Sequence, residues 1–386
     1  MSLVDNDHGL LVMIFVCIQE GLGQLPPGVG GVKGGFEPHL DAEFPVEVPE
    51  TGPGGDLAAL PPVLLEVALR VPIPMGKRLV LWWVVVTVTA MFTVLTAPAL
   101  AVEPVNYSRC AVDGHDVYLV AVDLSDARVE ARPVLAHGRT GHVADLAEMA
   151  RSVGAVAAVN GGFFNAYTDM TPWGTLVIDG TTYRAGGSGG AVGITPDGRL
   201  KFAELRVQIK GGINGGEEWP NNWYAWDVNR NIDDPQAIVV FTPGFGQEMR
   251  APAATTITVR GGRVEGLRSG PVPIPPDGYV IGFGPGAGQI ASRFSVGDTV
   301  QVWYEFSDAS GGLLDWSDVS HILQGGPLLL RDGRDATHLS RHTWRDPKFF
   351  ARGPRGFVGA DWQGKLLMGV VSGVTMDELA GVLRKM

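Results

Sequence analysis

Two pairs of glycines and one arginine are the residues of this sequence best suited to bind an anion. The first pair follows an asparagine and the second precedes a proline: Asn160, Gly161 and Gly162, then Gly325 and Gly326. Because glycine has no side chain, its backbone N–H can come close to a bound oxyanion. Arg355 carries a planar guanidinium that can bind phosphate or carboxylate through two hydrogen bonds. These residues predict a site for an anionic group.

The segment around Asn160 also has a purely structural interpretation. Residues 155–159 are small or β-branched, which predicts a short strand buried on both faces. Asn-Gly is a common hairpin signal, and Phe163 and Phe164 could fill the core behind such a turn. The turn and the binding site remain alternatives at this point.

Aromatic and acidic residues are concentrated between residues 217 and 234. Flat aromatic rings beside hydrogen-bond acceptors suit a sugar, whose C–H face stacks on a ring while its hydroxyls form hydrogen bonds. We therefore take Trp223 and Trp226 as candidate sugar contacts. The alternative is a long loop that folds over its own aromatic side chains.

Composition narrows the class of protein. The 386 residues carry a net charge of −11, which makes nucleic acid an improbable partner. Only two cysteines are present, Cys17 and Cys110, so neither a disulfide framework nor a cysteine-based zinc site is expected. The sequence contains no G-x-S-x-G, H-E-x-x-H or Walker motif, and we expect no metal ion and no cofactor.

Residues 75–101 have the features of a signal peptide. A short basic stretch precedes an apolar run, and small residues follow at the positions that a signal peptidase needs. We expect cleavage after Ala101 and a secreted or extracellular protein, with an uncleaved membrane anchor as the alternative. Residues 1–74 are rich in glycine and proline and are interpreted as a non-native upstream extension or a disordered segment. The remaining domain then comprises residues 102–386.

The abundance of glycine and proline favours strands and loops over helices. Residues 116–124 are predicted to form a strand, with residues 128–134 as its hairpin partner. Further strands are expected at residues 238–242, 255–260 and 279–283. The predicted fold class is α+β: a strand-rich domain of mixed sheets with few helices and long glycine-rich loops.

Two helices stand out from this pattern. Apolar residues from 142 to 153 recur at helical spacing, and Gly154 is placed to end that helix. Near the C-terminus, Thr375 and Glu378 have the spacing of a capping box at the start of a second helix.

Taken in order, these segments resemble the phosphodiester glycosidase domain family, whose type enzyme is N-acetylglucosamine-1-phosphodiester α-N-acetylglucosaminidase. The likeness runs through residues 117–382. Residues 160–164 (Asn-Gly-Gly-Phe-Phe) resemble its first signature, and residues 325–327 (Gly-Gly-Pro), followed by an apolar strand, its second. Arg355 matches a Pro-Arg-Thr step of the family, but Gly356 replaces the threonine and removes a hydroxyl.

The resemblance implies hydrolysis of a sugar–phosphate diester at the anomeric C–O bond, with a carbohydrate or glycan-phosphate as substrate. Phosphate is a good leaving group, so the site must neutralise it and stabilise an oxocarbenium-like sugar. The glycine N–H groups and Arg355 suit the first task, a carboxylate suits the second, and Asn160 would orient a sugar hydroxyl or hold the turn. The candidate carboxylates, each also typical of a turn or surface, are Asp169, Asp179 and Asp346.

The family pattern continues beyond the last helix into a strand and an Asp-Gly-Gly-Gly-Ser motif that this sequence does not contain. We expect little activity from a chain without that motif. Three alternatives therefore remain: a secreted sugar-phosphodiester hydrolase, an endo-acting glycosidase of cell-wall arabinan, and an inactive carbohydrate-binding protein. The glycosidase would require a true acid–base pair of carboxylates, because its leaving group is an alkoxide.

Overall fold

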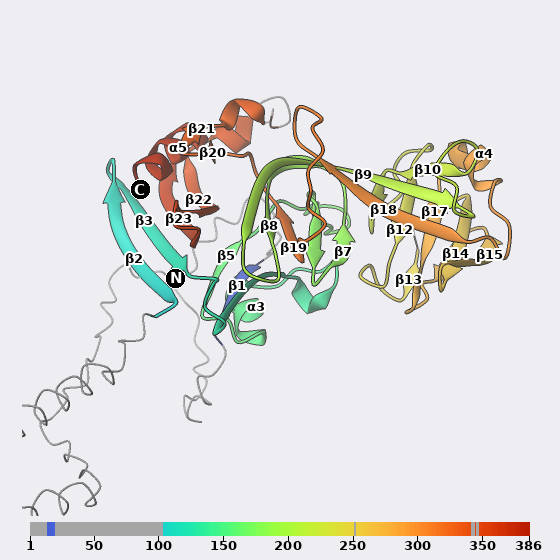
Figure 1. Ribbon diagram of the computed structural model, residues 1–386, viewed down its shortest axis with the longest axis horizontal. Coiled ribbons are helices and arrows are strands. Elements are labelled where there is room, and N and C mark those ends of the chain that lie inside the picture. Colours follow the sequence, from blue (N-terminus) through green and yellow to red (C-terminus); the bar gives the residue numbers. More distant parts are fainter. Residues whose placement is uncertain (1–13, 20–102, 251, 341–343, 345–346) are drawn as a thin grey trace, which may run out of the picture. The chain divides into compact units, whose positions relative to one another are not determined.

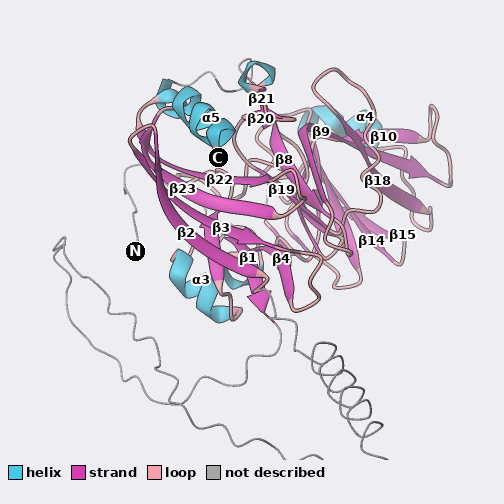
Figure 2. Cartoon of the chain, turned by 60° about the vertical axis from the view of Figure 1, so that its left-hand side comes forward, coloured by secondary structure: helices cyan, strands magenta, loops and turns pink. Residues whose placement is uncertain are grey.

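The computed structural model describes residues 14–19, 103–250, 252–340, 344 and 347–386, which belong to one compact unit (Figure 1). The predicted signal peptide and most of residues 1–74 lie outside the described residues. Six sheets and three α-helices make up the described residues, which confirms a strand-rich α+β fold (Figure 2). None of the helices described is long and apolar enough to cross a membrane.

The largest sheet has seven strands in the order β10-β9-β8-β19-β6-β7, and β18 pairs with the other edge of β9. Its strands are β6 (Leu176–Ile178), β7 (Thr181–Arg184), β8 (Ser188–Ile194), β9 (Leu200–Ile213), β10 (Asn222–Ala225), β18 (Val300–Ser307) and β19 (His321–Gln324). The long strand β9 pairs first with β8 and then with β10 and β18. Figure 1 shows β9 running between these two groups of strands.

A five-stranded sheet has the order β11-β12-β17-β14-β15. Its strands are β11 (Asp227–Val228), β12 (Ile238–Phe241), β14 (Thr255–Arg260), β15 (Arg263–Arg268) and β17 (Gly278–Phe283). The strands predicted at residues 238–242, 255–260 and 279–283 are confirmed, and they lie side by side. Between the strands of this sheet in the sequence lie β13 (Glu248–Met249) and β16 (Val272–Pro273), which pair with each other. The helix α4 (Gly288–Ala291) comes after β17.

A four-stranded sheet has the order β2-β3-β23-β22, and the helix α5 (Met376–Lys385) follows β23. Its strands are β2 (Val105–Val112), β3 (His115–Val122), β22 (Gly353–Ala360) and β23 (Leu366–Val374). The predicted capping box of α5 is confirmed: Thr375 accepts from the N–H of Glu378 and donates its own N–H to that carboxylate. α5 packs Met376, Leu379 and Val382 against the sheet.

The third sheet places β1 (Ile14–Gln19) between β4 (Val129–Val134) and β5 (Ala157–Asn160), antiparallel to both. The predicted hairpin between residues 116–124 and 128–134 is therefore wrong, because β3 pairs on its two edges with β2 and β23. The helix α3 (Leu146–Ser152) is shorter than predicted. Asp145 caps it by accepting from two N–H groups, and Gly154 follows with a φ of 67°.

Short elements complete the chain. They are the pair β20 (Leu330–Arg331) and β21 (Arg334–Asp335) and the 3-10 helices η1 (Ala136–Gly138), η2 (Pro285–Ala287), η3 (Thr337–Leu339) and η4 (Pro347–Phe350). The loops that follow β5 and β19 carry the two glycine signatures, so the packing of these two strands positions the candidate site.

Candidate functional site

The two glycine signatures meet, although they are far apart in the sequence. β5 ends at Asn160 and β19 ends at Gln324, and the loops that follow are in van der Waals contact. A Cβ atom on Gly162 would lie 2.5 Å from the carbonyl oxygen of Gln324 and 3.2 Å from the Cα of Gly325. Only glycine permits this approach, as the sequence predicted on physical grounds. We call this contact the glycine junction.

Gln324 fixes the second signature in place. Its side chain is buried, and its Oε1 accepts from the N–H of Thr175 at 2.8 Å. Its Nε2 donates to the carbonyl oxygens of Gly189 at 3.1 Å and Leu205 at 2.7 Å. Three hydrogen bonds thus join Gln324 to the residue before β6, to β8 and to β9, and a buried amide satisfied in this way is costly to disturb. The sequence analysis did not identify this residue.

The backbone donors at the junction are not equivalent. The N–H of Gly325 donates to the carbonyl of Gly190 at 2.9 Å, and the carbonyl of Gly326 accepts from the N–H of Gly190 at 2.7 Å. Gly325 therefore serves the sheet, whereas within the described residues no backbone carbonyl accepts from the N–H of Gly161, Gly162 or Gly326.

Asp169 lies in the loop that follows the first signature and is held by hydrogen bonds. Its Oδ1 accepts from Asn165 Nδ2 at 3.1 Å, from the N–H of Thr171 at 3.1 Å and from Thr171 Oγ1 at 2.7 Å. Burial alone would raise the pKa of this carboxyl, but the hydrogen bonds from Thr171 and Asn165 outweigh it and lower the pKa. Asp169 is therefore an ionised carboxylate in a fixed position.

A buried ion pair lies beneath the same loop. Arg184, at the end of β7, contacts the carboxylate of Asp227, and both side chains are almost completely buried. Arg184 Nε also donates to the carbonyl of Pro172 at 2.6 Å. Burial lowers the pKa of Arg184 to about 9. A Cβ on Gly186 would come within 3.2 Å of Asp227 Oδ2, so a glycine makes room for the pair.

Four aromatic rings cluster around the first signature. Phe163 lies 4.9 Å from Phe349 and 5.3 Å from Trp344 between ring centroids, and Trp173 lies 5.9 Å from Phe163. Trp173 is 40% exposed, whereas Trp344 is buried. Phe163 therefore has the packing role that the structural interpretation gives it. Its ring contacts other aromatic side chains and not the N–H groups of the two glycines.

Arg355 lies on β22, beside β5. A Cβ on its neighbour Gly356 would lie 3.4 Å from Val159 Cγ2, so β22 faces the strand that carries the first signature. Adjacent strand residues point to opposite faces, and Arg355 therefore shares the face of Phe357, which packs with α5 and is turned away from Val159. Its Nη2 donates to the carbonyl of Ala351, and its Nε is buried with no hydrogen-bond partner among the described residues. Burial lowers the pKa of this guanidinium.

Asp179 lies away from the junction. It occupies the β6–β7 turn with a φ of 50°, whereas the junction is at the other end of β6, near Thr175. Its N–H donates to His321 Nδ1 at 3.1 Å, and its carboxylate lies 3.6 Å from Arg132 Nη1. Burial lowers the pKa of His321, which begins β19 as a strand-end histidine. Asp346 lies outside the described residues.

The two candidate tryptophans occupy different environments. Trp223 is only 2% exposed and packs edge-on against Phe294 at 5.8 Å. Trp226 is 54% exposed. The alternation of β10 explains the difference, because Trp223 and Ala225 point inward while Tyr224 and Trp226 point to solvent. Of the two candidates, only Trp226 is exposed enough to stack on a sugar ring.

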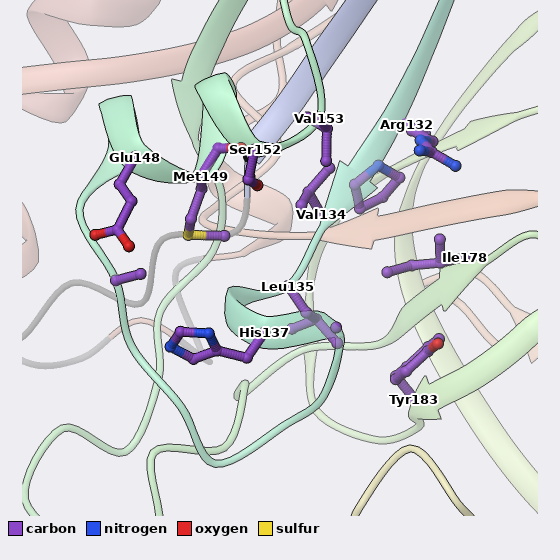
Figure 3. Close-up of a pocket in the computed structure, with 13 residues that line it drawn as sticks. Arg132, Val134, Leu135, His137, Glu148, Met149, Ser152, Val153, Ile178 and Tyr183 are labelled. Carbon is purple, nitrogen blue, oxygen red and sulfur yellow. Dashed lines mark hydrogen bonds between the residues drawn. The ribbon is translucent and has the colours of Figure 1, made fainter.

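A separate cavity of about 330 Å³ lies between α3, β4 and the β6–β7 hairpin. Figure 3 shows Met149 and Val134 on its apolar walls, with Glu148, His137 and Arg132 at its margin. None of the predicted site residues lines it. Within the described residues, no group of three or more His, Cys, Asp or Glu side chains could hold a metal ion.

A known protein family matches the C-terminal part of the chain. Residues 253–386 match the model of the phosphodiester glycosidase family. The match includes the second signature and Arg355, and it confirms the resemblance seen in the sequence. The first signature lies outside the matched residues. No curated protein sequence matches this chain significantly.

Two solved structures share the fold. A hypothetical protein from Synechocystis has a TM-score of 0.61 and 20% identity, with 75% of this chain and 59% of that chain covered. A protein of Burkholderia pseudomallei thought to be exported has a TM-score of 0.55 and 20% identity, with 70% of this chain and 65% of that chain covered. This chain thus spans less than two thirds of the length of either protein, and identities this low show the fold alone.

Proposed function

We propose, from the match of residues 253–386 to the phosphodiester glycosidase family, that this protein is a secreted hydrolase of extracellular or cell-wall glycans. It cleaves a sugar–phosphate diester at the glycosidic C–O bond and releases a phosphate monoester. The observation that carries the proposal is the glycine junction, where the N–H groups of Gly161 and Gly162 are not used by the described backbone.

The junction would bind the departing phosphate. Backbone N–H groups fixed before the reaction stabilise a developing negative charge without reorganising, which is the most effective kind of electrostatic catalysis. The loop is held rigid on one side by Gln324 and on the other by the aromatic cluster of Phe163. A phosphate monoester needs little general-acid assistance, so a site built from such donors suits this leaving group.

Asp169 is the carboxylate that we assign to the sugar side. Its lowered pKa keeps it ionised, and its hydrogen bonds to Asn165 and Thr171 fix its position. An ionised carboxylate stabilises an oxocarbenium-like transition state, as nucleophile or as electrostatic partner. Asn160, at the end of β5, would orient a sugar hydroxyl, and Trp226 would stack on a sugar ring.

Arg355 is the second partner of the phosphate that the family resemblance implies, although its side chain lies with Phe357 on the face of β22 turned away from Val159. Its buried Nε lacks a partner among the described residues, and buried donors are ordinarily hydrogen-bonded. Arg355→Lys keeps the charge and removes the planar fork, so turnover of the methyl diester of N-acetylglucosamine 1-phosphate should fall more than about tenfold.

The matched measurement is the melting temperature of Arg355→Lys and Arg355→Ala. If the arginine is purely structural, Arg355→Ala melts at a lower temperature and its turnover per folded molecule is unchanged, which would overturn the assignment.

A non-catalytic carbohydrate-binding protein is the second candidate. It is favoured by one observation: the carboxylates near the junction are already engaged, Asp169 by hydrogen bonds and Asp227 by Arg184. Sugar binding without any turnover of the diester would support this candidate over the hydrolase.

A further inference from the structure

The outward face of the β10-β9-β18 ribbon carries a row of side chains that the proposed reaction does not use. The strand register sets Tyr224, Lys210 and Trp303 directly opposite one another across the three strands. Facing residues on neighbouring strands have their side chains on the same side of the sheet. The opposite face, with Ile209 and Trp223, is packed in the core. The row therefore faces away from the core.

An ion pair adjoins the row. Lys210 Nζ donates to Glu305 Oε2 at 2.7 Å, and both side chains remain partly exposed. Glu305 is two residues after Trp303 and lies on the same face. The hydrogen bond to Glu305 raises the pKa of Lys210, with smaller contributions from Tyr224 and Glu217. A hydrogen-bonded donor and acceptor thus lie on the same face as the two aromatic side chains.

Glycine at position 212 gives Trp303 room to lie along the sheet. A Cβ on Gly212 would be 3.4 Å from Trp303 Cζ3 and 2.7 Å from the carbonyl oxygen of Gly216. The loop that contains Gly216 therefore folds over this end of the face. Tyr224, at the other end of the row, is 45% exposed.

The chain leads from this face toward the loop of the candidate site. After Tyr224 the chain alternates outward and inward, so that Trp226 is exposed and Asp227 is buried against Arg184 below the loop of Asp169. A polymer lying along Tyr224 and Trp226 would therefore be directed toward the residues assigned to the sugar side of the reaction.

We infer that Tyr224, Lys210, Trp303 and Glu305 form a binding platform for a neutral polysaccharide chain, whose sugar rings stack on the two aromatic side chains and whose hydroxyls pair with the ion pair. This inference rests on the proposed function, because it concerns the part of that substrate that lies away from the phosphate. We expect the polysaccharide to be neutral, because Glu217, Glu218 and the net charge of −11 repel acidic glycans.

The platform is tested by affinity electrophoresis, which measures how far the full chain migrates in gels that contain a polysaccharide. The neutral polysaccharides are arabinan, mannan and dextran, and polygalacturonate is the acidic comparison. At least one neutral polysaccharide should retard the protein, and polygalacturonate should not. Tyr224→Ala and Trp303→Ala should each weaken that binding about tenfold, the value of a lost aromatic stacking contact. Tyr224→Ala removes an exposed ring, so its folding is not at risk.

Trp362→Ala is the matched control, because Trp362 is 92% exposed and lies in the β22–β23 turn, off the platform. It should bind as tightly as the unmodified chain. The inference is overturned if no neutral polysaccharide retards the protein, if polygalacturonate binds equally well, or if Trp362→Ala weakens binding as much as Tyr224→Ala.

Hydrolysis of a short methyl diester, which is too small to reach the platform, should be the same for Tyr224→Ala and the unmodified chain. Failure of the platform therefore leaves the proposed reaction standing, and failure of the reaction leaves the platform standing.

Discussion

Replacing Gly162 by alanine should separate the two signatures. The new Cβ would lie 2.5 Å from the carbonyl oxygen of Gln324, whereas ordinary contact begins at 3.4 Å, so the loops must move apart by 3.4 − 2.5 = 0.9 Å. Gln324 cannot yield easily, because its side chain makes three buried hydrogen bonds. Forcing a group into a packed interior costs about 1–3 kcal/mol, and alanine returns about 0.4–1 kcal/mol by restricting the unfolded chain.

The expected net loss of stability is therefore between about 0 and 2.6 kcal/mol. The effect on turnover should be larger, because a displacement of about 1 Å at a reacting centre can reduce a rate about 100-fold. kcat/KM for the methyl diester of N-acetylglucosamine 1-phosphate and the melting temperature are measured on the same preparations. Gly356→Ala is the control, since its Cβ would lie 3.4 Å from Val159 Cγ2.

A Gly162→Ala variant that keeps its turnover within a few-fold would refute the reasoning. Equal losses in Gly162→Ala and Gly356→Ala would refute it as well, because they would show that any added methyl group near β5 is harmful.

Two further predictions concern buried charge. Asp227→Asn leaves the Arg184 guanidinium buried without its counter-charge and should lower the free energy of urea unfolding by about 3–5 kcal/mol. The control is Asp233→Asn, at an exposed carboxylate 3.6 Å from Arg230, which should change that free energy by less than about 1 kcal/mol. Equal losses in the two variants would contradict the account. Burial lowers the pKa of His321 below the ordinary 6.5, so its neutral form stabilises the fold above pH 6.5 and this contribution is lost as the pH falls through the folded-state pKa. His321→Gln should flatten the decline in unfolding free energy between pH 6.5 and 5, leaving the part due to His142; an unchanged slope would show that His321 does not contribute.

Local signals in the sequence predicted much of the fold. The capping box of Thr375 and Glu378 identified the start of α5, since its two hydrogen bonds join residues three apart. The strands β12, β14 and β17 followed from runs of β-branched residues. The close approach at Gly162 followed from the absence of side chains in both signatures.

The errors involve partners distant in the chain. The edges of β3 are taken by β2 and β23, and no property of residues 128–134 reveals that β4 pairs instead with β1. Arg184 and Asp227 likewise carry no local sign of their ion pair. Trp223 could have been separated from Trp226, because the period of a strand sends residues 223 and 226 to opposite faces.

The central claim is cleavage at the anomeric C–O bond with phosphate as the leaving group. The measurement is hydrolysis of the methyl diester of N-acetylglucosamine 1-phosphate in water enriched in oxygen-18, with mass spectrometry of both products. The account predicts that the label enters the sugar and that the methyl phosphate is unlabelled. Label in the phosphate would mean attack at phosphorus, and either that result or the absence of any hydrolysis would contradict it.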